Sequence, residues 1–193
     1  MTFFRYSSRE VKEVEIERAI KNVQAGKKAD YTYIIQHYEH KVYTTVFRFV
    51  RQHDLAQDLV QDIFIKVFYN IHKYRAVGSF NAWFYRIVMN HCYDYLRKSP
   101  VQFEVVEPQF VEKQHPEKIL LKQEQQQHLN ELLQHLDQTE YFILLLRYVN
   151  EISYDEIAEI LQIPLNEVRN KLHRSKRKLR QLATTKGGYF LEV

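Results

Sequence analysis

The sequence has few of the residues that form disulfides, tight turns or membrane spans. Cys92 is the single cysteine, which excludes an internal disulfide and fits a reducing compartment, so we expect a cytoplasmic protein. Only four glycines and four prolines occur, which disfavours a sheet assembly dense in turns. No apolar run approaches the roughly 20 residues of a membrane span, and residues 1–10 lack the apolar core of a signal peptide.

The residues that are plentiful favour helices. Leu, Ile, Glu, Gln and Lys are common, and 45% apolar residues with 14% aromatics supply enough side chains for sizeable cores. The net charge of +4 permits a polyanionic partner without requiring one. Its distribution is more informative, because residues 169–180 hold seven bases and no acid. We predict an all-α protein with a local basic face.

Three of the four prolines fall in one stretch that lacks helical periodicity. They are Pro100, Pro108 and Pro116, and acids outnumber bases around them. We therefore predict two small helical domains, at residues 10–98 and 118–182, joined by a flexible linker at residues 99–117.

Two amphipathic helices are predicted in the first domain, with a loop around Gly78 between them. Asp54 is placed to cap the first helix, whose polar side carries Asp58, Gln61 and Asp62 and would ordinarily be a solvated face. The polar side of the second helix mixes basic, amide and aromatic side chains. Such side chains can either pack within the protein or contact unpaired nucleobases. The apolar stripe of the first helix is Leu55, Leu59, Ile63, Phe64, Val67, Phe68 and Ile71; the polar side of the second includes Tyr85, Arg86, Asn90, Tyr93 and Arg97.

The second domain contains the most specific local motif. Ser153 to Glu156 forms a capping box that opens a short helix, which Pro164 ends by disfavouring helical geometry at the residue before it. Asn166 can then cap a second helix that runs to Leu179. Two short helices joined in this way predict a helix-turn-helix, although a chance helical hairpin would share the pattern. Its exposed face would be Arg169, Asn170, His173, Arg174 and Arg177.

With both halves described, the order of motifs resembles the sigma factors of bacterial RNA polymerase, specifically the small two-domain extracytoplasmic-function (ECF) group. The resemblance runs from about residue 20 to residue 182. Residues 54–68 (DLAQDLVQDIFIKVF) resemble the family's core-binding helix, and residues 80–90 (FNAWFYRIVMN) its promoter-melting helix. Residues 145–161 (LLRYVNEISYDEIAEIL) and 173–179 (HRSKRKL) resemble its helix-turn-helix.

The resemblance implies a role for each motif in directing core polymerase to promoters. It places the core-polymerase contacts, made to the coiled coil of the largest subunit, at Asp58, Gln61 and Asp62. It places the downstream promoter contacts at Arg75, Ser79, Phe80, Asn81, Tyr85, Arg86, Asn90, Tyr93 and Arg97. It places the upstream promoter contacts at Arg169, Asn170, Lys171, His173, Arg174 and Arg177, with Lys176 and Lys178 also expected at phosphates.

The same resemblance implies an anti-sigma protein, often membrane-bound, that covers the polymerase-binding and DNA-binding faces. Two local departures from the family pattern are present. Asn166-Glu167 stand where Gly-Thr is frequent, and Asp137 stands where a proline is more usual, before an apolar helix. The glutamate suits a helix start but would repel a phosphate.

Two alternatives to a sigma factor remain open on the sequence alone. One is a conventional helix-turn-helix regulator with a sensor or dimerisation domain, and the other is a helical adaptor that binds only proteins. An enzyme, a metal site or a cofactor is not expected, because His37 with His40, and His128 with His135, have no third ligand at a recognised spacing.

Overall fold

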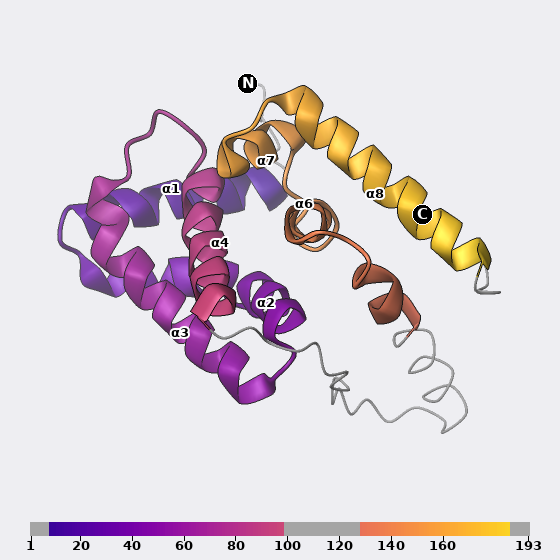
Figure 1. Cartoon of the computed structure of the whole chain (residues 1–193). Helices are drawn as coiled ribbons and strands as arrows, with labels where there is room; N and C mark the ends of the chain where they lie inside the picture. The colour runs from indigo at the N-terminus through magenta and orange to yellow at the C-terminus, as the bar shows by residue number, and fades with distance from the viewer. Residues whose placement is uncertain (1–7, 99–127, 186–193) are drawn as a thin grey trace. The chain divides into compact units, whose positions relative to one another are not determined.

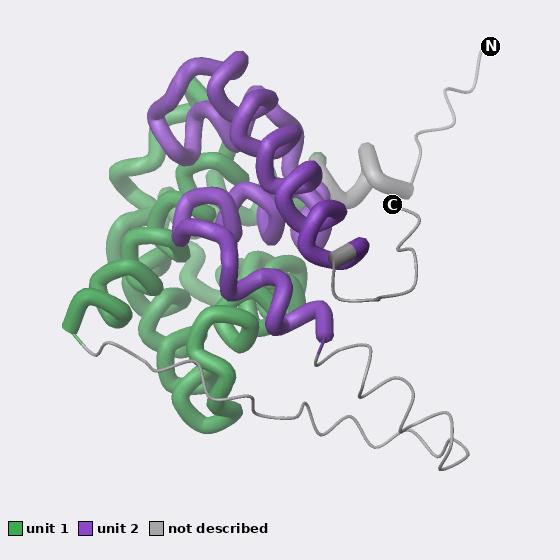
Figure 2. Tube along the Cα trace, turned by 45° about the vertical axis from the view of Figure 1, so that its right-hand side comes forward, with its two compact units in different colours: residues 1–100 green, residues 101–193 purple. Residues whose placement is uncertain are grey.

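The computed structural model describes residues 8–98 and 128–185, and all regular elements in these ranges are helices (Figure 1). The all-α prediction is therefore confirmed. The chain divides into two compact units, residues 1–100 and 101–193 (Figure 2). The predicted linker at residues 99–117 lies outside the described residues. Within the described ranges, no helix is both long and apolar enough to cross a membrane.

The described part of unit 1, residues 8–98, contains four α-helices and two single-turn 3-10 helices. The order is α1 (Ser8–Gln24), η1 (Lys28–Asp30), α2 (Tyr31–Val50), α3 (His53–Asn70), η2 (Ile71–Lys73) and α4 (Phe80–Lys98). Helix α2 ends at Val50 and is followed by Arg51, whose left-handed backbone (φ 53°) turns the chain into α3. Helix α2 packs against α1, α3 and α4, and α3 also packs against α4. The core therefore lies among α2, α3 and α4, and the buried residues Ile16, Ala19, Ile20 and Val23 of α1 extend it.

The apolar stripe predicted for α3 faces this core. Its buried members recur at spacings of three and four and are Leu59, Ile63, Phe64, Val67 and Ile71, whereas Leu55 and Phe68 are half-buried. The predicted cap at Asp54 is wrong. Helix α3 begins at His53, with the extended Gln52 (φ −127°) at the N-cap and no side-chain cap bond, so Asp54 lies inside the first turn.

Unit 2 begins, in its described part, with a helical segment at residues 128–133, followed by α6 (Gln138–Tyr148). Helix α6 opens with a capping box that was not predicted from the sequence. The side chain of Asp137 accepts a hydrogen bond from the Glu140 N–H at 2.7 Å, and the Glu140 carboxylate accepts one from the Asp137 N–H at 3.1 Å. Residues 141–146 are all buried, and α6 packs against the two helices that follow.

These two helices, α7 (Tyr154–Leu161) and α8 (Leu165–Thr185), form the predicted helix-turn-helix. The capping box of Ser153 with Glu156 is present, and α7 ends at Gln162 in a left-handed conformation (φ 56°). Asn166 does not cap α8. The helix begins at Leu165, one residue earlier than Asn166. Pro164 stands before this first helical residue, and its carbonyl accepts hydrogen bonds from the N–H groups of Glu167 and Val168.

Candidate nucleic-acid and protein interfaces

The long helix α8 presents one buried and one basic face. Val168, Leu172 and Ser175 are buried, with the Ser175 hydroxyl donating to the Lys171 carbonyl at 2.8 Å. Because these positions recur at spacings of three and four, the residues between them point to solvent. The exposed residues are the five predicted at the sequence level: Arg169, Asn170, His173, Arg174 and Arg177.

Two lysines of α8 differ from these five exposed residues. Lys171 is half-buried. The Lys176 ammonium lies 4.9 Å from the centre of the Tyr148 ring, a cation–π arrangement that ties α8 to the end of α6. On α6 itself, the Arg147 guanidinium lies 4.8 Å from the Tyr154 ring and donates to the Ile152 carbonyl at 3.1 Å. These contacts hold α6, α7 and α8 together behind the basic face.

In unit 1, the loop between η2 and α4 is closed by its own hydrogen bonds. The Tyr74 hydroxyl donates to the Gly78 carbonyl at 3.0 Å, and Arg75 donates to the His72 carbonyl at 3.0 Å. From α1, the Gln24 amide donates to the Tyr74 carbonyl at 3.0 Å. Between these anchors Val77 is 96% exposed, although an apolar side chain ordinarily packs against its own protein. No pattern in the sequence predicts the exposure of Val77.

Aromatic rings fix the start of α4 beneath this loop. The Phe80 ring is buried, with its centre 5.1 Å from that of Tyr74 and 5.4 Å from that of Trp83. The Tyr38 hydroxyl of α2 donates to the Asn81 side-chain oxygen at 2.5 Å. Of the predicted loop contacts, Arg75 is exposed, Ser79 and Asn81 are half-buried, and Phe80 is buried.

The prediction that Tyr85 lies on the polar side of α4 is wrong. Tyr85 is 1% exposed, and its ring centre lies 5.5 Å from that of Phe84 and 6.3 Å from that of Tyr38. Both α2 and α3 pack against α4, so the buried arc of this helix is wider than one apolar stripe. A single-stripe pattern therefore misplaced the residue at its edge.

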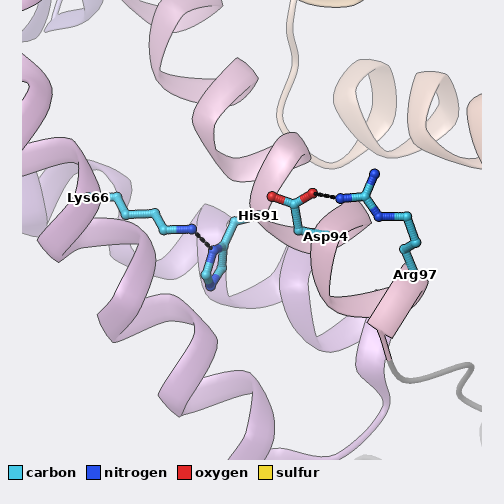
Figure 3. Close-up of polar contacts among 4 residues, drawn as sticks. All are labelled: Lys66, His91, Asp94 and Arg97. Carbon is cyan, nitrogen blue, oxygen red and sulfur yellow. Dashed lines mark hydrogen bonds and ion pairs between the residues drawn. The ribbon is translucent and has the colours of Figure 1, made fainter.

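The other predicted positions of α4 are accessible to different degrees. Asn90 and Arg97 are exposed, whereas Arg86 and Tyr93 are half-buried. The Arg97 guanidinium pairs with Asp94 at 2.9 Å, one turn earlier on the same helix (Figure 3). Exposed residues thus concentrate toward the C-terminal half of α4.

The outer face of α3 carries the three predicted protein-contact residues, Asp58, Gln61 and Asp62, all of them exposed. The same face continues with Ile65, 46% exposed, and Tyr69, 69% exposed. Spacings of three or four residues place these side chains along one side of the helix. The exposed face of α3 therefore changes from acidic to apolar along its length, and its apolar part was missed in the sequence.

Two family models match the chain, one in each unit. Residues 34–100 match Sigma-70 region 2, and residues 126–179 match Sigma-70, region 4. The chain belongs to the sigma-70 family of RNA polymerase sigma factors. Being an ECF-type sigma factor, it directs RNA polymerase to promoters through contacts with core polymerase and promoter DNA, and it is not an enzyme. The regulator and adaptor alternatives are therefore set aside.

Relatives of this sigma factor span both units. It is 28% identical over 172 residues to the RNA polymerase sigma-H factor of Pseudomonas aeruginosa, covering 83% of this chain and 89% of the relative. It is 27% identical over 181 residues to the ECF RNA polymerase sigma factor SigW of Bacillus subtilis, covering 88% and 97%. Its fold is similar to that of the sigma factor RpoE in complex with the anti-sigma factor NepR from Bartonella quintana, with a TM-score of 0.65, 19% identity and coverage of 80% and 97%.

Proposed function

We propose that the two units of this sigma factor divide promoter recognition between them. Unit 1 binds the coiled coil of the largest polymerase subunit through α3 and opens the downstream promoter element with the loop before α4 and with α4 itself. Unit 2 holds the upstream element as duplex DNA through α8. The observation that carries this proposal is the exposed basic face of α8, the second helix of a helix-turn-helix whose first helix, α7, opens with a capping box. The protein then acts in the cytoplasm, where the polymerase is.

On α8, the first turns of the helix offer side chains suited to base edges. Arginine can donate two hydrogen bonds to guanine, and asparagine can pair with adenine, each contact discriminating by about 1–3 kcal/mol. Arg169, Asn170, His173 and Arg174 fill this role, while Lys171 and Arg177 meet phosphates. Glu167 is exposed next to them and would keep the adjoining phosphate away from the helix start.

Arg174 gives a direct test of this assignment. Arg174→Ala should weaken binding of the cognate upstream duplex more than binding of random duplex, because only the former includes a base contact. Arg180→Ala is the matched control, since Arg180 is also exposed but lies further along α8. Titration of polymerase holoenzyme with the two duplexes would measure both ratios. An equal loss on both duplexes would assign Arg174 to a phosphate instead.

On unit 1, the loop and the accessible residues of α4 are proposed to hold unpaired bases. Arg75, Ser79 and Asn81 lie at the loop, and Arg86, Asn90, Tyr93 and Arg97 follow along α4. Phe80 is assigned a supporting role here, because its ring packs beneath the loop, and Tyr85 is assigned to the core. Unstacking a base from the duplex costs roughly a few kcal/mol, and its capture by this surface would return a free energy of similar size.

The polymerase-docking surface, defined as Asp58, Gln61 and Asp62 of α3, can be tested by reversing one charge. Asp62→Arg should weaken binding to core polymerase, since an exposed acid would become a base within the contact. The control is Glu39→Arg, which makes the same change at an exposed position of α2. Competition with the unmodified sigma factor for core polymerase would compare them. Unchanged affinity of the Asp62 variant would refute this docking surface.

We further propose that an anti-sigma protein, membrane-bound in the cell, covers the docking surface and the basic face of α8. This proposal is supported by the family and by the solved relative bound to an anti-sigma factor. The purified chain should then start promoter-specific run-off transcription with core polymerase on a genomic template library, without an inducing signal. No promoter-specific transcript from active core would contradict the whole proposed function.

A further inference from the structure

A histidine of α4 holds a lysine of α3 at the edge of the docking surface. The Lys66 ammonium donates a hydrogen bond to Nδ1 of His91 at 2.6 Å (Figure 3). An ammonium group can only donate, so Nδ1 must accept, and the imidazole must be neutral with its proton on Nε2. Nε2 lies 3.9 Å from the Asp62 carboxylate, too far for a hydrogen bond.

The surroundings of His91 favour this neutral form. Its side chain is only 11% exposed, against 63% for Asp62. Burial lowers the pKa of His91, and the Lys66 charge lowers it further. Asp62 and Asp94 act in the opposite direction with less effect than Lys66, and Lys98 on the same helix lowers the pKa by the smallest amount. The acceptor at Nδ1 is therefore retained at neutral pH.

The hydrogen bond from Lys66 to His91 matters because Lys66 is also placed to pair with Asp62. The two residues are four apart on α3, with the acid on the N-terminal side, which is the favourable arrangement for an ion pair on a helix. In the described part of the chain, however, no ion pair joins them, and the Lys66 ammonium contacts His91 instead. The carboxylate of Asp62 thus keeps its exposed side for an external cation.

We propose that His91 is a positioning residue of the docking surface, which draws Lys66 away from Asp62 and so keeps the Asp62 carboxylate available to core polymerase. This inference rests on the proposed docking surface. It links α4, the promoter-opening helix, to the polymerase contact on α3. Without His91, Lys66 is released to pair with Asp62, and core polymerase must displace that lysine before it binds.

The test compares full-length variants in competition with the unmodified sigma factor for limiting core polymerase at low salt. His91→Ala should lower relative affinity about twofold, the equilibrium equivalent of one ion pair at this spacing. His91→Gln should retain affinity, because its amide oxygen can accept from Lys66. Lys66→Met should bind normally, and His91→Ala combined with Lys66→Met should bind as well as Lys66→Met alone. His40→Ala, at an exposed histidine of α2, is the control.

The outcomes separate this inference from the docking surface on which it rests. A loss for His91→Ala that disappears in the Lys66→Met background supports the inference. The same loss in both backgrounds would overturn it, because His91 would then act through packing alone. Normal binding of His91→Ala together with weak binding of Asp62→Asn would overturn it while the docking surface stands. Normal binding of Asp62→Asn would remove both.

Discussion

Replacing Asp137 tests the capping box at the start of α6, the helix on which the helix-turn-helix rests. Asp137 accepts from the Glu140 N–H and donates its own N–H to the Glu140 carboxylate, at 2.7 and 3.1 Å. Its φ is −69°, within the range that a proline ring imposes. Alanine, asparagine and proline at this position therefore change separate parts of the arrangement.

The expected losses of stability follow from these contacts. Asp137→Ala removes the cap and should cost about 1 kcal/mol. Asp137→Asn keeps an acceptor oxygen and should be nearly neutral. Asp137→Pro removes the cap and also the N–H that donates to Glu140, an exposed bond. Proline also restricts the unfolded chain, which stabilises by about 0.4–1 kcal/mol where the backbone already fits, so the net cost of Asp137→Pro should be slightly below that of Asp137→Ala.

Amide hydrogen exchange of α6 in the full-length chain would measure these differences locally. The single tryptophan, Trp83, lies in unit 1, so the urea dependence of its fluorescence should be the same in all variants and serves as the internal control. The expected order of protection is unmodified and Asp137→Asn, then Asp137→Pro, then Asp137→Ala. Greater loss for proline than for alanine would refute the backbone argument, and an unchanged alanine variant would refute the capping argument.

Three further predictions concern the core of unit 1. Phe84→Ala should destabilise unit 1 by about 3–5 kcal/mol in urea unfolding followed by Trp83 fluorescence, because a fully buried ring is lost; a loss below about 1 kcal/mol would contradict this packing. Burial raises the pKa of the Cys92 thiol to about 12, so stability should fall as pH rises above 9, where only the unfolded thiol ionises; Cys92→Ala should lessen that fall, and the buried Tyr31 phenol, whose pKa is also raised, accounts for the part that remains. Burial lowers the pKa of His91, so stability should also fall below pH 6.5, where the unfolded chain takes up the proton first; an identical acid profile for His91→Gln would refute this.

Local patterns in the sequence predicted helix ends and helix faces well where interactions between near neighbours in the sequence decide them. The capping box at Ser153 and the end of α7 before Pro164 were both predicted, because short-range hydrogen bonding decides them. Asp137 and Glu140 have the same spacing as Ser153 and Glu156. Since aspartate is also a preferred N-cap residue, this second capping box could have been predicted by the same rule. Asp137 was instead interpreted as a departure from the family pattern, because a proline is more usual at that position.

Other features depend on contacts between helices, which no local pattern encodes. Tyr85 is buried because a second helix, α2, covers its side of α4. The bond between Lys66 and His91 joins residues 25 apart in sequence, so it becomes visible only when α3 and α4 are placed together. Which exposed side chains touch DNA or polymerase is decided by the partner's shape, and the chain alone carries only the charges and exposures.

Because α4 forms part of the core of unit 1, its buried positions limit where the proposed downstream promoter contacts can be changed. Seven of its positions are buried: Phe80, Ala82, Phe84, Tyr85, Val88, Met89 and Cys92. Substitutions there alter stability before they alter recognition. The loop before α4 is different, since the Tyr74 hydroxyl holds the Gly78 carbonyl and the Gln24 amide holds the Tyr74 carbonyl, while Arg75 and Val77 are exposed. A library built to retarget the downstream element should therefore vary these two loop side chains and leave the helix beneath them intact.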